Sequence, residues 1–296
     1  MTDETPEAPL MGVLRVLIAG TVLLAFLGLV GYSFWPELAV SLFGAVQSMR
    51  GIGAEEFESQ YFEVRNNSDA SDAQVRGVVA TLENDYQAIA EYLGRSPSDP
   101  IPVLITNGQG MALIDGDRLN VFYDQGVLDL NSAPFFLVFL MEDRRLEADT
   151  NIFLEAGFAI YVTEEIGRSE NFTGQPADAW VTLLQQRNAL LPLSEAWAVR
   201  IPESDDDEAV YSFLRSLVMS GSFARWLIET YGQETFDELR EGASLEYAIG
   251  LSLDDAEAAW LASVAAHGVA SRPCRLASPP GSFLQYLCEL LNETNP

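Results

Sequence analysis

The feature that most constrains this chain is an uncharged apolar stretch near its N-terminus. Residues 16–35 read VLIAGTVLLAFLGLVGYSFW and contain no acidic or basic side chain. About twenty apolar residues in a helix cross the hydrocarbon core of a bilayer, whereas the apolar part of a secretory signal is only about 7–15 residues long. We therefore expect a transmembrane helix that stays uncleaved. A cleaved signal is the alternative, and its only candidate site is Ala39-Val40-Ser41.

The charges beside this stretch predict its orientation. Arg15 precedes it directly, and the segment that follows carries Glu37 and no basic residue before Arg50. Because basic residues favour the cytoplasmic side, we expect the N-terminus inside and the bulk of the chain outside the cell membrane. The next apolar run, FFLVFLM at residues 135–141, is too short to span and predicts a buried helix.

The charge balance of the chain indicates which kinds of partner it can be expected to bind. The chain of 296 residues has 44 acidic and 16 basic side chains, all of the latter arginine, for a net charge of −28. Such a surface repels phosphate, so nucleic acid is not an expected partner. Three interpretations of the acidity stay open: a solvated surface, an adaptation to high salt, or a surface that meets a basic partner.

Hydrophobic periodicity and turn residues predict an α+β fold beyond residue 58. An extended segment at 61–65 precedes a helix that Asp72 caps, that runs over 72–93 and that Gly94 ends. Strands at 102–106 and 119–123 follow, with a turn at Asp115-Gly116. The rest is helical, at 134–146, 150–166, 178–190, 207–219, 222–230, 233–241, 244–249 and 253–266. The expected organisation is a tail (1–15), a transmembrane helix (16–35), a linker (36–58), a domain (59–266) and a C-terminal tail (267–296).

Several phrases of this domain occur in a characteristic order. They are ENDYQAIAEYLG (83–94), FLEAGFAIYV (153–162), SGSFARWLIETYG (220–232), EGASLEYA (241–248) and LSLDD (251–255), closing on Trp260. Over roughly residues 60–264 the chain resembles the peptidase MA-like families, the gluzincin branch of zinc metallopeptidases. The resemblance implies a small N-terminal sheet with helices and a mainly helical C-terminal half. It also implies a zinc site made by two histidines of an HExxH helix and a glutamate of the next helix.

The residues that such a zinc site requires are absent. The matching helix, within residues 133–146, reads APFFLVFLMEDRRL and has no histidine. The position of the third ligand aligns with Ala156, and Glu155 lies one step, or about 100°, around the helix. The only histidine is His267, beyond the matched region. We therefore expect no zinc, no other cofactor and no catalytic residue of this kind.

The sequence thus predicts a pseudo-peptidase, a membrane-anchored extracytoplasmic module that binds or scaffolds a protein or peptide partner. Two alternatives stay open: a hydrolase that uses a non-standard site, and an accessory subunit of a membrane complex. The vestigial substrate cleft is expected at Phe136, Phe139, Glu155, Ala156, Gly157 and Tyr161.

Two cysteines lie in the C-terminal tail. Cys274 and Cys288 are 14 residues apart and flank a proline-rich loop. Outside the cell this arrangement favours a disulfide bond. A rival interpretation joins both cysteines with His267 in a zinc site. His267 itself is expected on the surface, near the C-terminal end of the 253–266 helix.

Overall fold

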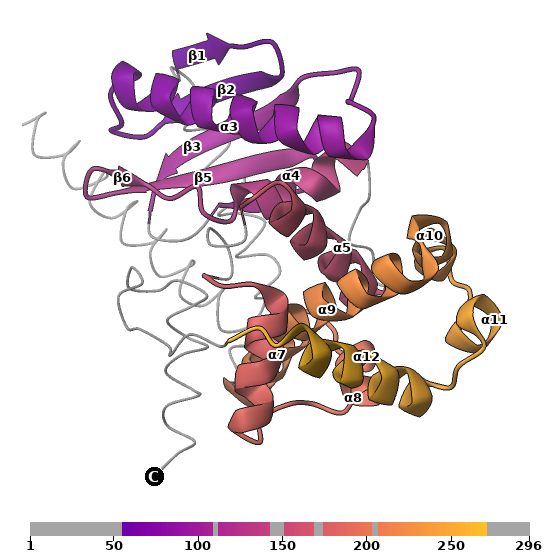
Figure 1. The fold of residues 1–296 in the computed structure, drawn as a ribbon. Helices are drawn as coiled ribbons and strands as arrows, with labels where there is room; N and C mark the ends of the chain where they lie inside the picture. The colour runs from indigo at the N-terminus through magenta and orange to yellow at the C-terminus, as the bar shows by residue number, and fades with distance from the viewer. Residues whose placement is uncertain (1–54, 109–111, 143–150, 169–173, 203–206, 271–296) are drawn as a thin grey trace, which may run out of the picture. The chain divides into compact units, whose positions relative to one another are not determined.

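The computed structural model describes residues 55–108, 112–142, 151–168, 174–202 and 207–270. The chain divides into two compact units, residues 1–54 and residues 55–296, and every described element belongs to the second. This second unit is an α+β fold in which a small mixed sheet precedes a mostly helical part (Figure 1). The predicted fold class is confirmed at this level. The apolar stretch at 16–35 lies outside the described residues, and the helices inside them include none with the length and apolar character of a membrane span.

The sheet combines parallel and antiparallel strands. Its strand order is β1-β2-β3-β5-β4, with β6 paired to β5. The pairs β2–β3 and β3–β5 are parallel, and the three remaining pairs are antiparallel. The strands are β1 (Glu55–Glu58), β2 (Phe62–Asn67), β3 (Ile101–Asn107), β4 (Leu113–Asp115), β5 (Arg118–Asp124) and β6 (Val127–Leu128).

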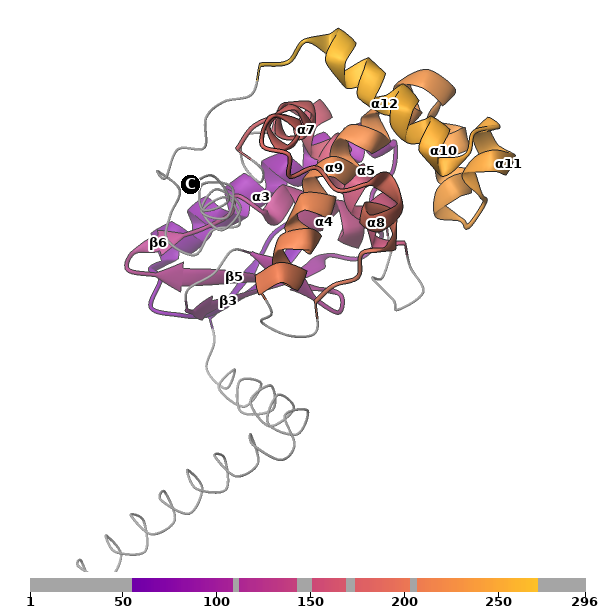
Figure 2. The same cartoon turned by 90° about the horizontal axis from the view of Figure 1, so that it is seen from below.

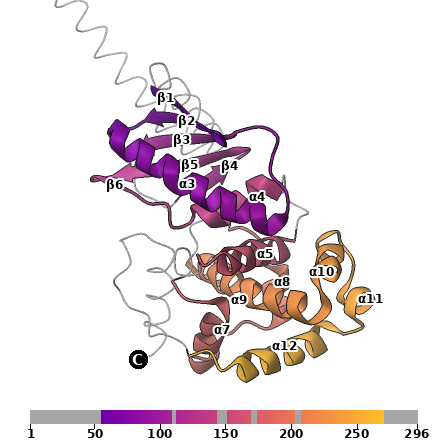
Figure 3. The ribbon, with the colours of Figure 1, turned by 45° about the horizontal axis from the view of Figure 1, so that its top comes forward.

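One face of the sheet is covered by α3 (Asp72–Leu93), which makes the crossover between the parallel strands β2 and β3 (Figures 1 and 3). Phe62 and Val64 of β2 alternate with exposed residues and are buried, as are Val75 and Leu82 of α3. Side chains that recur every second residue on β2 face side chains that recur with the helical period on α3, and together they form the core between the sheet and the helix.

The cap of α3 differs by one position from the prediction. Ser71, and not Asp72, is the N-cap: its Oγ accepts the N–H of Gln74, and Oε1 of Gln74 accepts the N–H of Ser71 at 2.9 Å. This reciprocal capping box satisfies two N–H groups that a helix start leaves unpaired. Asp72 is the first helical residue and pairs with Arg76. Gly94 ends the helix with φ of 65°, as predicted.

The helical part follows the sheet and is built around two helices in close contact. These are α5 and α9, which lie side by side in Figures 2 and 3. Nearly every side chain of α5 is buried, as expected of a helix surrounded by other elements. The helices are α4 (Ala133–Glu142), α5 (Ile152–Glu165), α7 (Ala177–Gln186), α8 (Leu193–Ala198), α9 (Asp207–Tyr231), α10 (Gln233–Arg240), α11 (Leu245–Ile249) and α12 (Leu253–His267).

The helix α9 corrects the prediction of two separate helices at 207–219 and 222–230. Ser220, Gly221 and Ser222 interrupt the apolar pattern there, yet the helix continues through them and both serines are buried. A β-carbon at Gly221 would collide with Cγ2 of Ile160 on α5. Glycine at this position lets the two helices pack closely, and this packing outweighs its low helix propensity of about 1 kcal/mol.

Candidate functional site

A buried cluster of charges joins three helices of the helical part. Arg240, the last residue of α10, donates from Nη2 to Oε2 of Glu155 on α5 at 2.5 Å, and from Nε to the same oxygen at 3.1 Å. The same Nη2 also donates to Oε2 of Glu142 on α4. The side chains of Arg240 and Glu155 are each 2% exposed and that of Glu142 is 6% exposed. One guanidinium therefore holds carboxylates from two different helices.

The environment of Arg240 keeps it charged. Burial alone would lower the pKa of the guanidinium, but the hydrogen bonds and negative charges of Glu155 and Glu142 raise it above its ordinary value. Its Cζ lies 4.3 Å from the centroid of the Phe158 ring, which adds a cation–π contact. A buried cation of this kind is costly unless it is paired, and here its partners converge on it from α4 and α5.

The cluster continues toward solvent on both sides of Arg240. Arg95, just past the end of α3, pairs with Oε1 of Glu142 and is half-exposed. Asp237, one turn before Arg240 on α10, accepts from Arg240 Nη1 at 3.3 Å. The order Arg95–Glu142–Arg240–Glu155 thus alternates in sign from the surface to the core.

A cavity of about 510 Å³ opens beside this cluster. It lies between the last turns of α3 and α9, the end of α4, and α10. Charged, amide and apolar side chains line it together: Tyr92, Leu93, Arg95, Glu142, Phe158, Ile228, Gln233, Asp237, Arg240 and Glu241. Its volume is in the range of small-molecule and side-chain binding pockets.

The six residues predicted for a vestigial cleft are packed in or against the core, and none of them belongs to the lining of this cavity. Phe136 is partly buried, whereas the other five are buried. Gly157 packs against the backbone of Ser220, and the ring of Tyr161 meets that of Tyr92 edge-on, with centroids 6.2 Å apart. Glu155 lies off the aligned ligand position, as its helical step requires, and it points at Arg240. Two residues of the cavity lining contact them: Tyr92 contacts Tyr161, and Arg240 contacts Glu155.

Sequence reasoning missed Arg240 because its partner Glu155 is 85 residues away. One local signal points to it: Phe236, Leu239 and Arg240 follow the spacing i, i+3, i+4 on one helix face, and the first two are buried. An arginine on an apolar stripe requires a buried acid, but the sequence does not say which of its acids that is.

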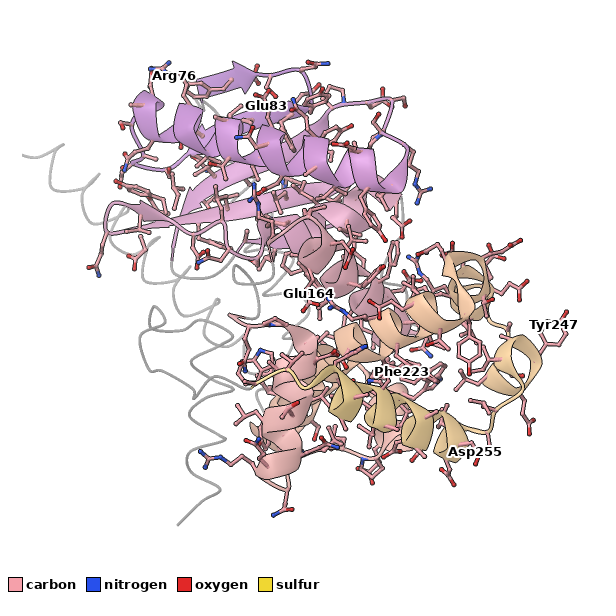
Figure 4. All side chains as sticks on the ribbon, viewed as in Figure 1. Arg76, Glu83, Glu164, Phe223, Tyr247 and Asp255 are labelled. Atoms are coloured by element: carbon pink, nitrogen blue, oxygen red, sulfur yellow. The ribbon has the colours of Figure 1, made fainter. Side chains whose placement is uncertain are left out.

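A second buried cluster joins α5, α7, α9 and α12. Glu164, near the end of α5 (Figure 4), accepts the N–H of Ala177 with Oε1 at 2.6 Å and pairs with Arg225 through Oε2. Burial raises the pKa of Glu164 to about 7, although Arg225 and the Ala177 N–H oppose the shift. Asp178 of α7 accepts from Ser222 Oγ at 2.5 Å.

His267 belongs to this second cluster. Its Nδ1 lies 3.2 Å from Oδ2 of Asp178, and its side chain is 41% exposed at the C-terminal end of α12. Ser222, Asp178 and His267 do not form a catalytic triad, because the serine hydroxyl bonds the aspartate and not the histidine. Ser222 is also 1% exposed and accepts the indole N–H of Trp260 at 2.9 Å, so it is sequestered from substrate.

In the part of the chain that the structure describes, no group of three or more His, Cys, Asp and Glu side chains is arranged to hold a metal ion. Cys274 and Cys288, the predicted disulfide and the rival zinc ligands, lie outside the described residues.

Comparison of the chain with protein-family models gives no match, and none of the curated proteins matches it. The resemblance to the peptidase MA-like families therefore stays a prediction drawn from the residues of this sequence.

Proposed function

We propose that this chain is a non-catalytic binding or scaffolding module with a metallopeptidase-like fold. Residues 16–35 anchor it in the cell membrane and the domain lies outside, where it binds a protein or peptide partner. The α+β order of the described elements agrees with this proposal, as does the absence of histidine from the helix that would carry an HExxH motif.

The observation that carries the proposal is the contact of Arg240 with Glu142 and Glu155. A carboxylate that serves as a general base must reach a water molecule or a substrate proton, and one that ligates a metal must offer it a lone pair. Glu142 and Glu155 direct oxygens at a guanidinium supplied by the chain itself. Their geometry supports a role in holding α4, α5 and α10 together.

The cavity beside Arg240 is the proposed place of binding. It combines apolar walls, from Leu93, Phe158 and Ile228, with polar groups at fixed positions. Six of its ten lining side chains are charged or amide, so the cavity is more polar than a typical ligand pocket and suits a polar or charged ligand. Arg95, Glu142 and Arg240 of the ion cluster belong to its lining, and their ion pairs hold these groups in place.

The catalytic part of this proposal is tested by incubating the purified full-length chain with a diverse peptide mixture and identifying products by mass spectrometry. We expect no cleavage that depends on this protein. Glu155→Gln and Glu164→Gln serve as paired variants, since each changes one buried glutamate of α5. Cleavage that persists in Glu164→Gln and disappears in a folded Glu155→Gln would overturn the proposal. Cleavage that also appears in a mock purification from cells without this chain identifies a contaminating peptidase, whereas cleavage found only with this chain, whichever variant is used, would overturn the proposal.

A further inference from the structure

The electrostatics of the Arg240 cavity select for a particular class of ligand. Three carboxylates line it, from Glu142, Asp237 and Glu241, and Glu155 lies behind Arg240. Two arginines oppose them. Arg240 is fully engaged with Glu155, Glu142 and Asp237, and Arg95 is paired with Glu142. The acids outnumber the bases, so the charge around the cavity is negative.

Two helix ends add to this negative potential. The last turn of α3 contributes Tyr92 and Leu93 to the lining, and the last turn of α9 contributes Ile228. Carbonyl groups at a helix C-terminus carry partial negative charge, which basic side chains commonly offset. Neither α3 nor α9 has a basic residue in its last turn, and the only basic side chain close to the end of α3 among the lining residues is Arg95, which is paired with Glu142.

The raised pKa of Tyr92 agrees with a negative charge around the cavity. This pKa is raised, first by burial, then by its neighbour Tyr161, and further by the negative charges of Glu165 and Asp237. Asp237 is therefore close enough to act on the phenol from across the cavity, and Glu165 acts on it from α5. A cation placed beside the Tyr92 ring would gain from both carboxylates and from the ring face.

The walls of the cavity suit a cation carried on an apolar stem. Leu93, Phe158 and Ile228 offer apolar surface, while Asp237 and Glu241 lie on α10 and at its end. Arginine and lysine side chains bury their methylene groups on such surfaces and keep the charged end among acids. In the cavity wall, the guanidinium of Arg240 already stacks on the Phe158 ring and is held by acids.

We propose that this cavity binds an arginine or lysine side chain of a polypeptide partner. The inference rests on the proposed function, and it adds the chemistry of the partner at one site. The net charge of −28 agrees with it, because a basic partner is attracted to the chain before it docks.

The test titrates the full-length chain with blocked tripeptides that differ only in the central residue: arginine, lysine, glutamine or glutamate. Free arginine is a fifth probe, which separates a polypeptide side chain from a small basic molecule. Binding is followed by ligand-observed NMR and by calorimetry. We expect saturable binding of the arginine and lysine tripeptides, about tenfold weaker binding of the glutamine tripeptide, and a loss of this difference at high salt.

The site is located by the double variant Asp237→Asn, Glu241→Gln. Its matched control is Glu234→Gln, Glu238→Gln, which removes the same charge from exposed positions of α10 outside the cavity lining. We expect the first to weaken binding of the arginine tripeptide about tenfold and the second less than about twofold. All four positions are at least partly exposed, so both variants should fold.

The alternative outcomes are distinct. Equal binding of arginine and glutamine tripeptides, both weakened by the cavity variant, would overturn the cationic preference and leave the binding module standing. If both double variants weaken binding of the arginine tripeptide equally, the attraction comes from the general surface charge of the chain, and the proposed site is wrong. If free arginine binds more tightly than the arginine tripeptide, the ligand of this cavity is a small basic molecule and not a side chain of a polypeptide. No saturable binding of any probe would overturn the cation site, while the proposed function is judged separately by the cleavage assay.

Discussion

A β-carbon added at Gly157 of α5 would lie 2.5 Å from the carbonyl oxygen of Ser220 on α9. That separation is shorter than any real contact of this kind, and the obstacle is backbone, which cannot rotate away. Helix α5 carries Glu164 and α9 carries Arg225, so the separation of these helices sets the geometry of the second charged cluster.

We predict that Gly157→Ala destabilises the fold by about 2–4 kcal/mol, because α5 and α9 must move apart. The control is Gly77→Ala on α3, where no atom lies within 4 Å of the added carbon. That exchange should stabilise the chain by about 0.5–1 kcal/mol, since alanine favours a helix. Denaturant midpoints measure both effects. Equal changes in the two variants would show that helix propensity, and not contact, decides at Gly157.

Arg240→Met should cost about 3–5 kcal/mol of stability, because it removes the cation from beside two buried carboxylates. The double variant Arg240→Met, Glu155→Met should be more stable than Arg240→Met alone, since it removes both buried charges and leaves Glu142 with Arg95. Urea unfolding of the single and double variants measures this coupling. Arg76→Met, at an exposed pair with Asp72, should change stability by less than about 0.5 kcal/mol. Additive losses from Arg240 and Glu155 would argue against the pairing.

The raised pKa of Glu164 predicts that the stability of the fold depends on pH. This pKa is about 7 in the folded chain against an ordinary value of 4.5. Below about pH 4.5 both states are protonated and the stabilisation is complete. As pH rises to 7 the unfolded chain releases its proton first, so stability falls, in total by roughly 3 kcal/mol. Above pH 7 the loss is constant.

The measurement for Glu164 is the unfolding free energy of the wild type and of Glu164→Gln from pH 4.5 to 8. Glutamine does not titrate, so the stability of the wild type relative to the variant should decline across this window. Glu91→Gln, at an exposed position of α3, controls for the loss of one acid. Parallel curves for the wild type and Glu164→Gln would contradict the raised pKa.

A thiol count and a metal analysis of the purified chain test the C-terminal tail. We expect no free thiol and no stoichiometric zinc, because Cys274 and Cys288 are predicted to form a disulfide. Cys274→Ser should then expose one thiol, from Cys288. One equivalent of zinc together with two thiols that become reactive on chelation would instead support a site of His267, Cys274 and Cys288.

The local elements of the fold were predictable because their signals lie in neighbouring residues. The long helix α3 has helical spacing and ends at Gly94, and the Asp115-Gly116 turn joins β4 to β5. By contrast, β1 has the sequence EEFE, whose acids favour a boundary. It is an edge strand held by backbone pairing to β2, and charged edge strands carry little hydrophobic pattern. The six residues of α8 are too few to display a period.

The charged clusters could not be predicted from a single sequence. Glu155 was identified as a residue of interest, but its bond to Arg240 spans 85 positions, and nothing local pairs them. The same holds for Asp178 and His267, which are 89 positions apart. A solitary histidine at a helix end reads as a surface residue, and its exposure of 41% is consistent with that expectation, while its contact to a buried aspartate depends on how α7 and α12 pack.

The cation that unites α4, α5 and α10 is covalently part of the polypeptide. It is delivered at synthesis in a fixed ratio of one to one, and it cannot be diluted, exchanged or captured by a chelator. A domain joined in this way holds the same shape in metal-poor and metal-rich surroundings. Its supply is set by translation alone, so forming this joint draws no metal ion from the surroundings.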